Sequence, residues 1–196
     1  MFTAKNFNIK ELSGISAKNI EEHLKLYAGY VKHANLCLSK VAELYPSTGS
    51  GQETAYEFGE INRRFGFEYN GMRNHETYFA LLEKDATPMN ETSELYQAIT
   101  MRWGSYDAWL AEFKAIAMTR GTGWAILYYD YENKILMNAW VDEQHIGQLQ
   151  NCKLIVALDM WEHAYVYDYA TSEKAKYIEA FFANLDWSVA ESNFLG

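Results

Sequence analysis

Asp159 and His163 stand four residues apart, directly after the apolar residues 154–158. Five apolar residues in a row predict a short buried strand that ends at the aspartate. A strand with a carboxylate at its end and an imidazole just beyond it can offer two ligands to one metal ion. The spacing also allows a simpler interpretation, in which the two side chains form a hydrogen-bonded structural pair.

The residues around this pair favour the metal. The segment Asp159-Met-Trp-Glu-His-Ala-Tyr165 resembles the C-terminal signature of the iron/manganese superoxide dismutases, in which the aspartate and the histidine are metal ligands. The resemblance covers residues 19 to 187. It implies that two more histidine ligands lie upstream.

Two upstream histidines match the remaining ligand motifs of the family. His75 lies in Arg73-Asn-His-Glu-Thr-Tyr-Phe79, which resembles the family pattern Asn-His-x-x-Tyr-Trp. His23 follows Ile20-Glu-Glu, which resembles Ile-Glu-x-His. The resemblance therefore implies a metal site made of His23, His75, Asp159 and His163.

Three imidazoles and one carboxylate suit a redox-active iron or manganese ion. Zinc accepts the same ligands, so the ligand types alone do not exclude it. The resemblance implies one Fe or Mn ion per subunit. These residues do not decide between the two metals.

The interval from His23 to Tyr30 is one residue shorter than in the family, where a tyrosine at this place guards the entrance to the metal. One residue turns a helix by about 100°, whereas a spacing of seven keeps His23 and Tyr30 on one face. Residues 26–28 stand where the family often has a histidine pair. His23 is the candidate ligand, and His33 is the alternative.

The family also uses a glutamine or a histidine that hydrogen-bonds metal-bound solvent. It comes from the second helix, four residues before the ligand, or from the loop after the second strand. The helix position is Gly71, so we expect the partner in residues 142–147. Gln144 and His145 both lie near the right distance before Asp159. We favour His145, for which an ordinary loop histidine is the alternative.

Three aromatic residues resemble those that wall the metal pocket of the family. They are Trp124, Trp161 and Phe79, the last in place of a tryptophan. Buried aromatics usually indicate only a core. Here they would also exclude water from the metal.

Glu162 resembles the glutamate that reaches across the family dimer to the partner's ligand histidine, which implies a homodimer or a tetramer. Val166 replaces one tyrosine of the interface, and the histidine that pairs with that tyrosine is also absent, so the geometry of the interface is an open question.

Lys174 approximates a family arginine near the entrance and would steer superoxide. Its alternative is an ordinary solvated lysine.

Helical periodicity predicts the elements that must position these residues. One helix begins near residue 16, and a second runs from about residue 54 to 84 after an exposed loop at residues 46–52. Gly66 and Gly71 interrupt the second pattern, which predicts a kink or a close helix contact. We therefore expect an antiparallel helical hairpin over residues 1–86.

The remaining residues, 87–196, predict a C-terminal α/β lobe, with the metal site between it and the hairpin. The expected fold class is α+β, with a three-stranded antiparallel sheet flanked by helices. The expected strands are residues 124–131, 135–141 and 154–159, and the expected helices are residues 93–103, 105–118, 174–184 and 187–193.

Composition limits the class of protein. The chain has 196 residues, of which 49% are hydrophobic, and its net charge is −9, which argues against nucleic acid as a partner. Cys37 and Cys152 have no CxxC partner, so no thiolate metal site is expected. There is neither a signal-peptide pattern nor a run of about 20 apolar residues. We expect a cytoplasmic protein that does not enter membranes.

The resemblance implies a superoxide dismutase, an oxidoreductase that converts superoxide to dioxygen and hydrogen peroxide while its metal cycles between the +3 and +2 states. The alternative is a catalytically impaired metal-binding homologue that stores metal or senses redox state. The shortened His23–Tyr30 interval, Gly71 and Val166 support this alternative. Because superoxide is an anion, the net charge of −9 opposes its approach.

Overall fold

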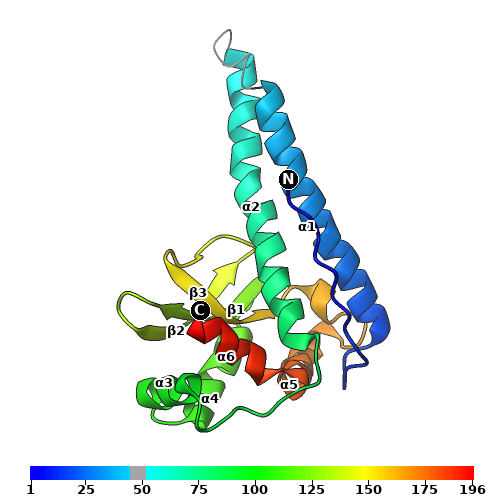
Figure 1. The fold of residues 1–196 in the computed structure, drawn as a ribbon. Coiled ribbons are helices and arrows are strands. Elements are labelled where there is room, and N and C mark those ends of the chain that lie inside the picture. The colour runs from blue at the N-terminus through cyan, green and yellow to red at the C-terminus, as the bar shows by residue number, and fades with distance from the viewer. Residues whose placement is uncertain (45–51) are drawn as a thin grey trace.

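Two long helices form a hairpin that projects from an α+β lobe in the computed structural model (Figure 1). The structure describes residues 1–44 and 52–196. Helix α1 spans Ala17–Leu44 and helix α2 spans Gln52–Leu82. The loop predicted between them lies outside the described residues, apart from its last residue.

Helix α1 follows from its sequence pattern. Ser16 caps its first turn, because its Oγ accepts a hydrogen bond from the Asn19 amide over 3.1 Å. Its buried residues recur at three- and four-residue steps and form one face against α2. This face includes Ile20, His23, Tyr27, Val31 and Ala34. The helix therefore brings His23 to the interior.

The lobe starts with two short helices, α3 (Glu94–Trp103) and α4 (Tyr106–Ala117). Ser93 and Ser105 cap them, since their side chains accept hydrogen bonds from backbone amides of the first turn. Gly104 ends α3 in the left-handed conformation, with φ 85°. Helix α4 then packs against the sheet.

The sheet has three antiparallel strands, as the sequence predicts, and their order is β2-β1-β3. They span Gly123–Asp130 (β1), Ile135–Asp142 (β2) and Cys152–Asp159 (β3). The register places Trp124 of β1 opposite Asp159 at the end of β3. An aromatic side chain is thereby brought beside the candidate ligand.

Short helices follow β3 and close the chain. They are η2 (Glu162–Ala164), η3 (Thr171–Glu173), α5 (Lys174–Asn184) and α6 (Trp187–Leu195). Helices α2 and α6 both contact β3, and η2 contacts α1. The turn that carries His163 therefore lies against the helix that carries His23.

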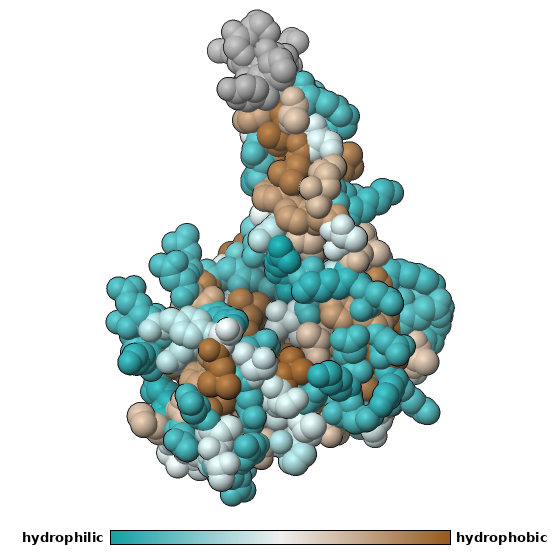
Figure 2. Space-filling model, in the orientation of Figure 1, coloured by the Kyte–Doolittle hydropathy of each residue, from teal (hydrophilic) through white to brown (hydrophobic). Residues whose placement is uncertain are grey.

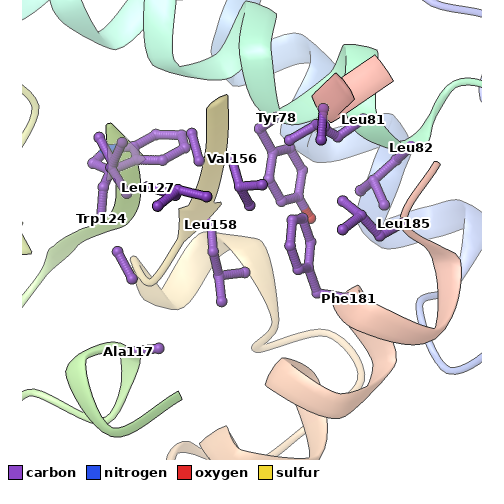
Figure 3. Packing of buried hydrophobic residues seen from close by; sticks show 14 of the residues in the cluster. Tyr78, Leu81, Leu82, Ala117, Trp124, Leu127, Val156, Leu158, Phe181 and Leu185 are labelled. Carbon is purple, nitrogen blue, oxygen red and sulfur yellow. The ribbon is translucent and has the colours of Figure 1, made fainter. Parts of the chain in front are cut away.

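The hydrophobic core joins the base of the hairpin to the lobe (Figure 3). Tyr78 of α2 stacks on Phe181 of α5, with ring centroids 5.6 Å apart. Leu127 and Val156 bring β1 and β3 into the same cluster. This packing fixes α2 against the sheet, which holds the two halves of the candidate site in place.

The projecting end of the hairpin carries apolar residues on the face seen in Figure 2. The exposed residues Leu36, Leu38 and Tyr56 belong to these helices.

No helix in the described part of the chain combines the length and the apolar character that a membrane span needs.

Candidate metal centre

Four side chains meet where the hairpin joins the lobe. Asp159 Oδ2 lies 3.1 Å from His23 Nε2, 3.4 Å from His75 Nε2 and 3.0 Å from His163 Nε2. One ligand atom from each residue lies within 4.8 Å of the others. The cluster contains His23 and not the alternative His33, which is exposed and faces Glu68.

Local structure aims each side chain inward. The Nδ1–H of His75 donates to the Gly71 carbonyl over 2.6 Å, which turns Nε2 toward the cluster. Asp159 Oδ1 accepts a hydrogen bond from the Trp161 amide over 2.9 Å, which leaves Oδ2 to face the histidines. His163 follows in η2, one turn later.

The cluster is buried and polar. Burial lowers the pKa of His23, and burial together with His23 lowers the pKa of His75 to about 3. Burial opposes ionisation of Asp159, but His163 and His23 outweigh it and hold the pKa of this carboxyl below its usual range. At neutral pH, the buried part of the site is therefore a carboxylate beside neutral imidazoles.

This donor set fits a metal ion. His75 Nε2 is buried and has no hydrogen-bond partner among the described residues, although such atoms are costly to leave unpaired. Coordination would use this nitrogen. Neutral imidazole nitrogens and one carboxylate are ligands that iron, manganese and zinc all accept.

Gln144 links the loop after β2 to the hairpin. Its Nε2 donates to the Tyr30 hydroxyl over 2.9 Å, and its Oε1 accepts from Trp124 Nε1 over 2.9 Å. The Asn74 side chain donates to the Gln144 carbonyl over 3.1 Å. Gln144 is fully buried and fixed at both ends.

His145, the partner expected from the sequence, lies against Phe67 instead. Its ring packs against Phe67, with centroids 5.8 Å apart, and its buried Nδ1 has no hydrogen-bond partner among the described residues. The structure thus brings Gln144, rather than His145, into contact with Tyr30.

Tyr30 lies between the helices at Gly71. Its ring centroid is 5.0 Å from that of His75. A Cβ on Gly71 would lie 2.5 Å from Tyr30 Cδ1, so the predicted close helix contact is confirmed. Burial and then Asp159 raise the pKa of Tyr30, so the phenol keeps its proton at neutral pH.

The three predicted aromatic residues surround the cluster. Ring centroids are 5.0 Å apart for Trp124 and His75, 4.9 Å for Phe79 and His23, and 5.7 Å for Trp161 and His163. Sequence reasoning missed Tyr78, whose ring lies 5.0 Å from His23. Its position three residues after His75 was a usable signal, because such residues share a helix face.

Tyr27 was also missed. It occupies the region where the family often has a histidine pair, and its ring stacks on His75 at 6.5 Å. Its hydroxyl accepts from the Lys5 amide over 2.9 Å and donates to Glu76 over 3.2 Å. A buried phenol therefore fastens the N-terminal segment to the hairpin beside the site.

Three further candidates, Glu162, Val166 and Lys174, lie outside the cluster. Glu162 and Val166 are exposed beside His163. Lys174 lies elsewhere: its Nζ donates to the Thr119 carbonyl over 2.8 Å and lies 5.6 Å from the centre of the Trp140 ring.

A pocket of about 340 Å³ leads toward the cluster. Tyr30, Trp161 and His163 line it, and the His163 side chain, 22% exposed, is the member of the cluster that reaches the pocket. A small molecule entering here would meet Tyr30 and His163. The size of the pocket therefore suits a small substrate.

Comparison with known proteins gives a consistent result. Residues 91–193 match the family model described as iron/manganese superoxide dismutases, C-terminal domain. The chain is 33% identical to an iron superoxide dismutase of Cupriavidus metallidurans over 94% of this chain and 90% of that protein. It is also 33% identical to an iron superoxide dismutase of Aquifex pyrophilus (94% and 86% coverage) and to manganese superoxide dismutase 1 of Halobacterium salinarum (86% and 80%).

Proposed function

Since this chain belongs to the iron/manganese superoxide dismutase family, we propose that it is a superoxide dismutase that converts superoxide to dioxygen and hydrogen peroxide. The observation that carries this proposal is the convergence of His23, His75, Asp159 and His163 to within 4.8 Å. One iron or manganese ion per subunit is the cofactor that these ligands would hold, between a hairpin of residues 1–86 and a lobe of residues 87–196.

The chemistry that the ion supplies when bound is one-electron exchange: one superoxide gives up an electron and leaves as dioxygen, and a second gains that electron with two protons and leaves as hydrogen peroxide. The protein must hold the ligands, deliver protons and exclude competing water. Three buried ligand side chains on α1, α2 and β3 meet the first need, because packed helices and strands fix their positions.

We assign proton handling to Tyr30 and Gln144. The Tyr30 oxygen accepts a hydrogen bond from Gln144, so its own O–H can donate to solvent or substrate in the pocket. The raised pKa of Tyr30 keeps that proton in place at neutral pH. Gln144, instead of His145, is then the partner of solvent at the metal, and Trp124, Trp161 and Phe79 exclude water.

We further propose a cytoplasmic homodimer, or a tetramer, that binds neither nucleic acid nor membranes. Glu162 is exposed beside His163, which suits contact with the ligand histidine of a second subunit. Exposed Val166 and Tyr167 add apolar area to the same surface. The net charge of −9 argues against nucleic acid.

Superoxide dismutase activity of protein loaded separately with iron and manganese, with the metal content quantified, tests the proposal. We expect activity with at least one metal and a loss of about 100-fold or more in His163→Ala, because the variant lacks a ligand. His33→Ala is the matched control, since it removes an exposed histidine that lines the pocket but is not a member of the cluster.

Stoichiometric metal without activity would overturn the proposal. It would favour the alternative, a metal-binding homologue that stores metal or senses redox state. Gly71 and the short His23–Tyr30 interval are the features that favour this second function.

A further inference from the structure

The pocket that leads to the metal centre contains one arginine. Of the described residues that line it, Arg64 is the only lysine or arginine. Tyr30, Trp161 and His163 line the same pocket. A charge at this place can act on an anion during its approach to the cluster.

Two contacts fix the Arg64 side chain. Its guanidinium carbon lies 3.8 Å from the centre of the Phe67 ring, and its Nε donates to Glu68 Oε1 over 2.7 Å. The Phe67 ring packs in turn on Tyr30 and Trp161, with centroid distances of 5.9 and 6.4 Å. The cation is therefore held over the aromatic wall of the pocket.

We propose that Arg64 is the residue that attracts superoxide into the metal-site pocket, an assignment that rests on the proposed function. The Arg64 side chain is 52% exposed, whereas its partner Glu68 is only 5% exposed. An anion that approaches from solvent therefore meets the guanidinium before the carboxylate. This local cation acts against the unfavourable net charge of −9.

The other candidate cations are less well placed. Lys174 contacts Thr119 and Trp140, and neither residue lines this pocket. His33 lines the pocket, but a histidine, unlike an arginine, is not permanently charged. Among the described residues, Arg64 is the one that combines a permanent charge, a fixed position and contact with the pocket wall.

Arg64→Gln compared with Arg63→Gln tests the proposal. Each variant loses one positive charge from α2, but Arg63 is 69% exposed, pairs with Glu60 and does not line the pocket. The second-order rate constant with superoxide is measured from about 10 to 200 mM ionic strength. We expect about a three- to tenfold decrease for Arg64→Gln at low ionic strength, a smaller one at high ionic strength, and a rate near that of the wild type for Arg63→Gln.

Two further measurements separate steering from other roles. Arg64→Lys retains the charge and should retain most of the rate, whereas a loss equal to that of Arg64→Gln would overturn the proposal in favour of packing on Phe67. Equal effects of Arg63→Gln and Arg64→Gln would also overturn it, because only net charge would then matter. A change in the oligomeric mass of Arg64→Gln, measured by light scattering, that accompanies the decrease in its rate constant would also overturn the proposal.

The rate of azide binding to the iron(III)-loaded protein, followed optically, does not depend on turnover. Slower binding in Arg64→Gln, with the same dependence on ionic strength, would support attraction of small anions even if the wild type were inactive and the proposed function failed. Normal azide binding and normal activity in Arg64→Gln would overturn the inference and leave the proposed function intact.

Discussion

Gly71 of α2 and Tyr30 of α1 pack so closely that a methyl group on Gly71 would lie 2.5 Å from Cδ1 of the Tyr30 ring. Gly71→Ala must therefore move Tyr30, which breaks its hydrogen bond with Gln144. We expect a loss of about 1–3 kcal/mol in the free energy of unfolding, partly offset by the better helix propensity of alanine. Urea unfolding measures this loss, and the pH profile of the activity reports on Tyr30.

Gly59→Ala is the matched control on the same helix. Gly59 is exposed, and a Cβ there would meet nothing within 4 Å. This variant should gain up to about 1 kcal/mol of stability. Equal effects of the two substitutions would show that the position of Tyr30 does not require a glycine at residue 71.

Gln144 and His145 are adjacent in sequence but differ in their contacts. Gln144→Ala removes the partner of both Tyr30 and Trp124 and should decrease activity by about 10- to 100-fold. His145→Ala should change activity by less than about threefold, since it mainly loses contact with Phe67. The optical spectrum of the metal-loaded protein checks that only the first substitution perturbs the metal site.

The metal-free protein should lose stability as the pH falls from 7 to 5. The folded-state pKa of His75 is about 3, below its ordinary value of about 6.5. In this window the unfolded chain takes up a proton that the folded chain does not, so acidification favours unfolding. One such histidine contributes about 2 kcal/mol, and His23 adds to the effect in the same direction.

Urea unfolding of the metal-free protein at pH 7 and at pH 5 gives the difference directly. Asp159 contributes little in this window, because its pKa is low when folded and about 3.9 when unfolded. His75→Gln should lose about 2 kcal/mol less than the wild type over the same interval. An identical pH dependence in the two proteins would contradict the assignment.

Lys174→Gln should reduce stability without changing the response to salt. Lys174 ties the start of α5 to the segment that follows α4 through the Thr119 carbonyl, a bond worth about 1–2 kcal/mol. The superoxide rate and its dependence on ionic strength should match those of the wild type. A weaker dependence in this variant would restore the steering role first expected from the sequence.

The sequence predicted the fold well because its signals are local. Helical periodicity places His23 and Tyr30 on one face of α1, and α1 is unbroken between them. The apolar run before Asp159 is strand β3. Residues that start helices and apolar strand segments likewise act within a few positions, which a single sequence can reveal.

The parts that could not be predicted depend on tertiary contacts. Whether Gln144 or His145 contacts Tyr30 depends on how the loop after β2 is held, and hydrogen bonds from Asn74 of α2 and from Gln148 to the Gln144 carbonyl hold it. Arg64 and Glu68 are four residues apart on a helix, a spacing typical of an ordinary surface ion pair. Only the fold shows that this pair lines the pocket.

The long separation of the ligands in the chain has a consequence for biosynthesis. His23 and Asp159 are 136 positions apart, and His163 follows later still. A nascent chain that has released only the hairpin has two of the four ligands, and a partly folded site binds metal weakly. The complete cluster therefore forms only after residue 163 has left the ribosome, when the hairpin has already been synthesised. The ion that binds this cluster then joins two separately made parts of the chain, so metal binding couples the hairpin to the lobe.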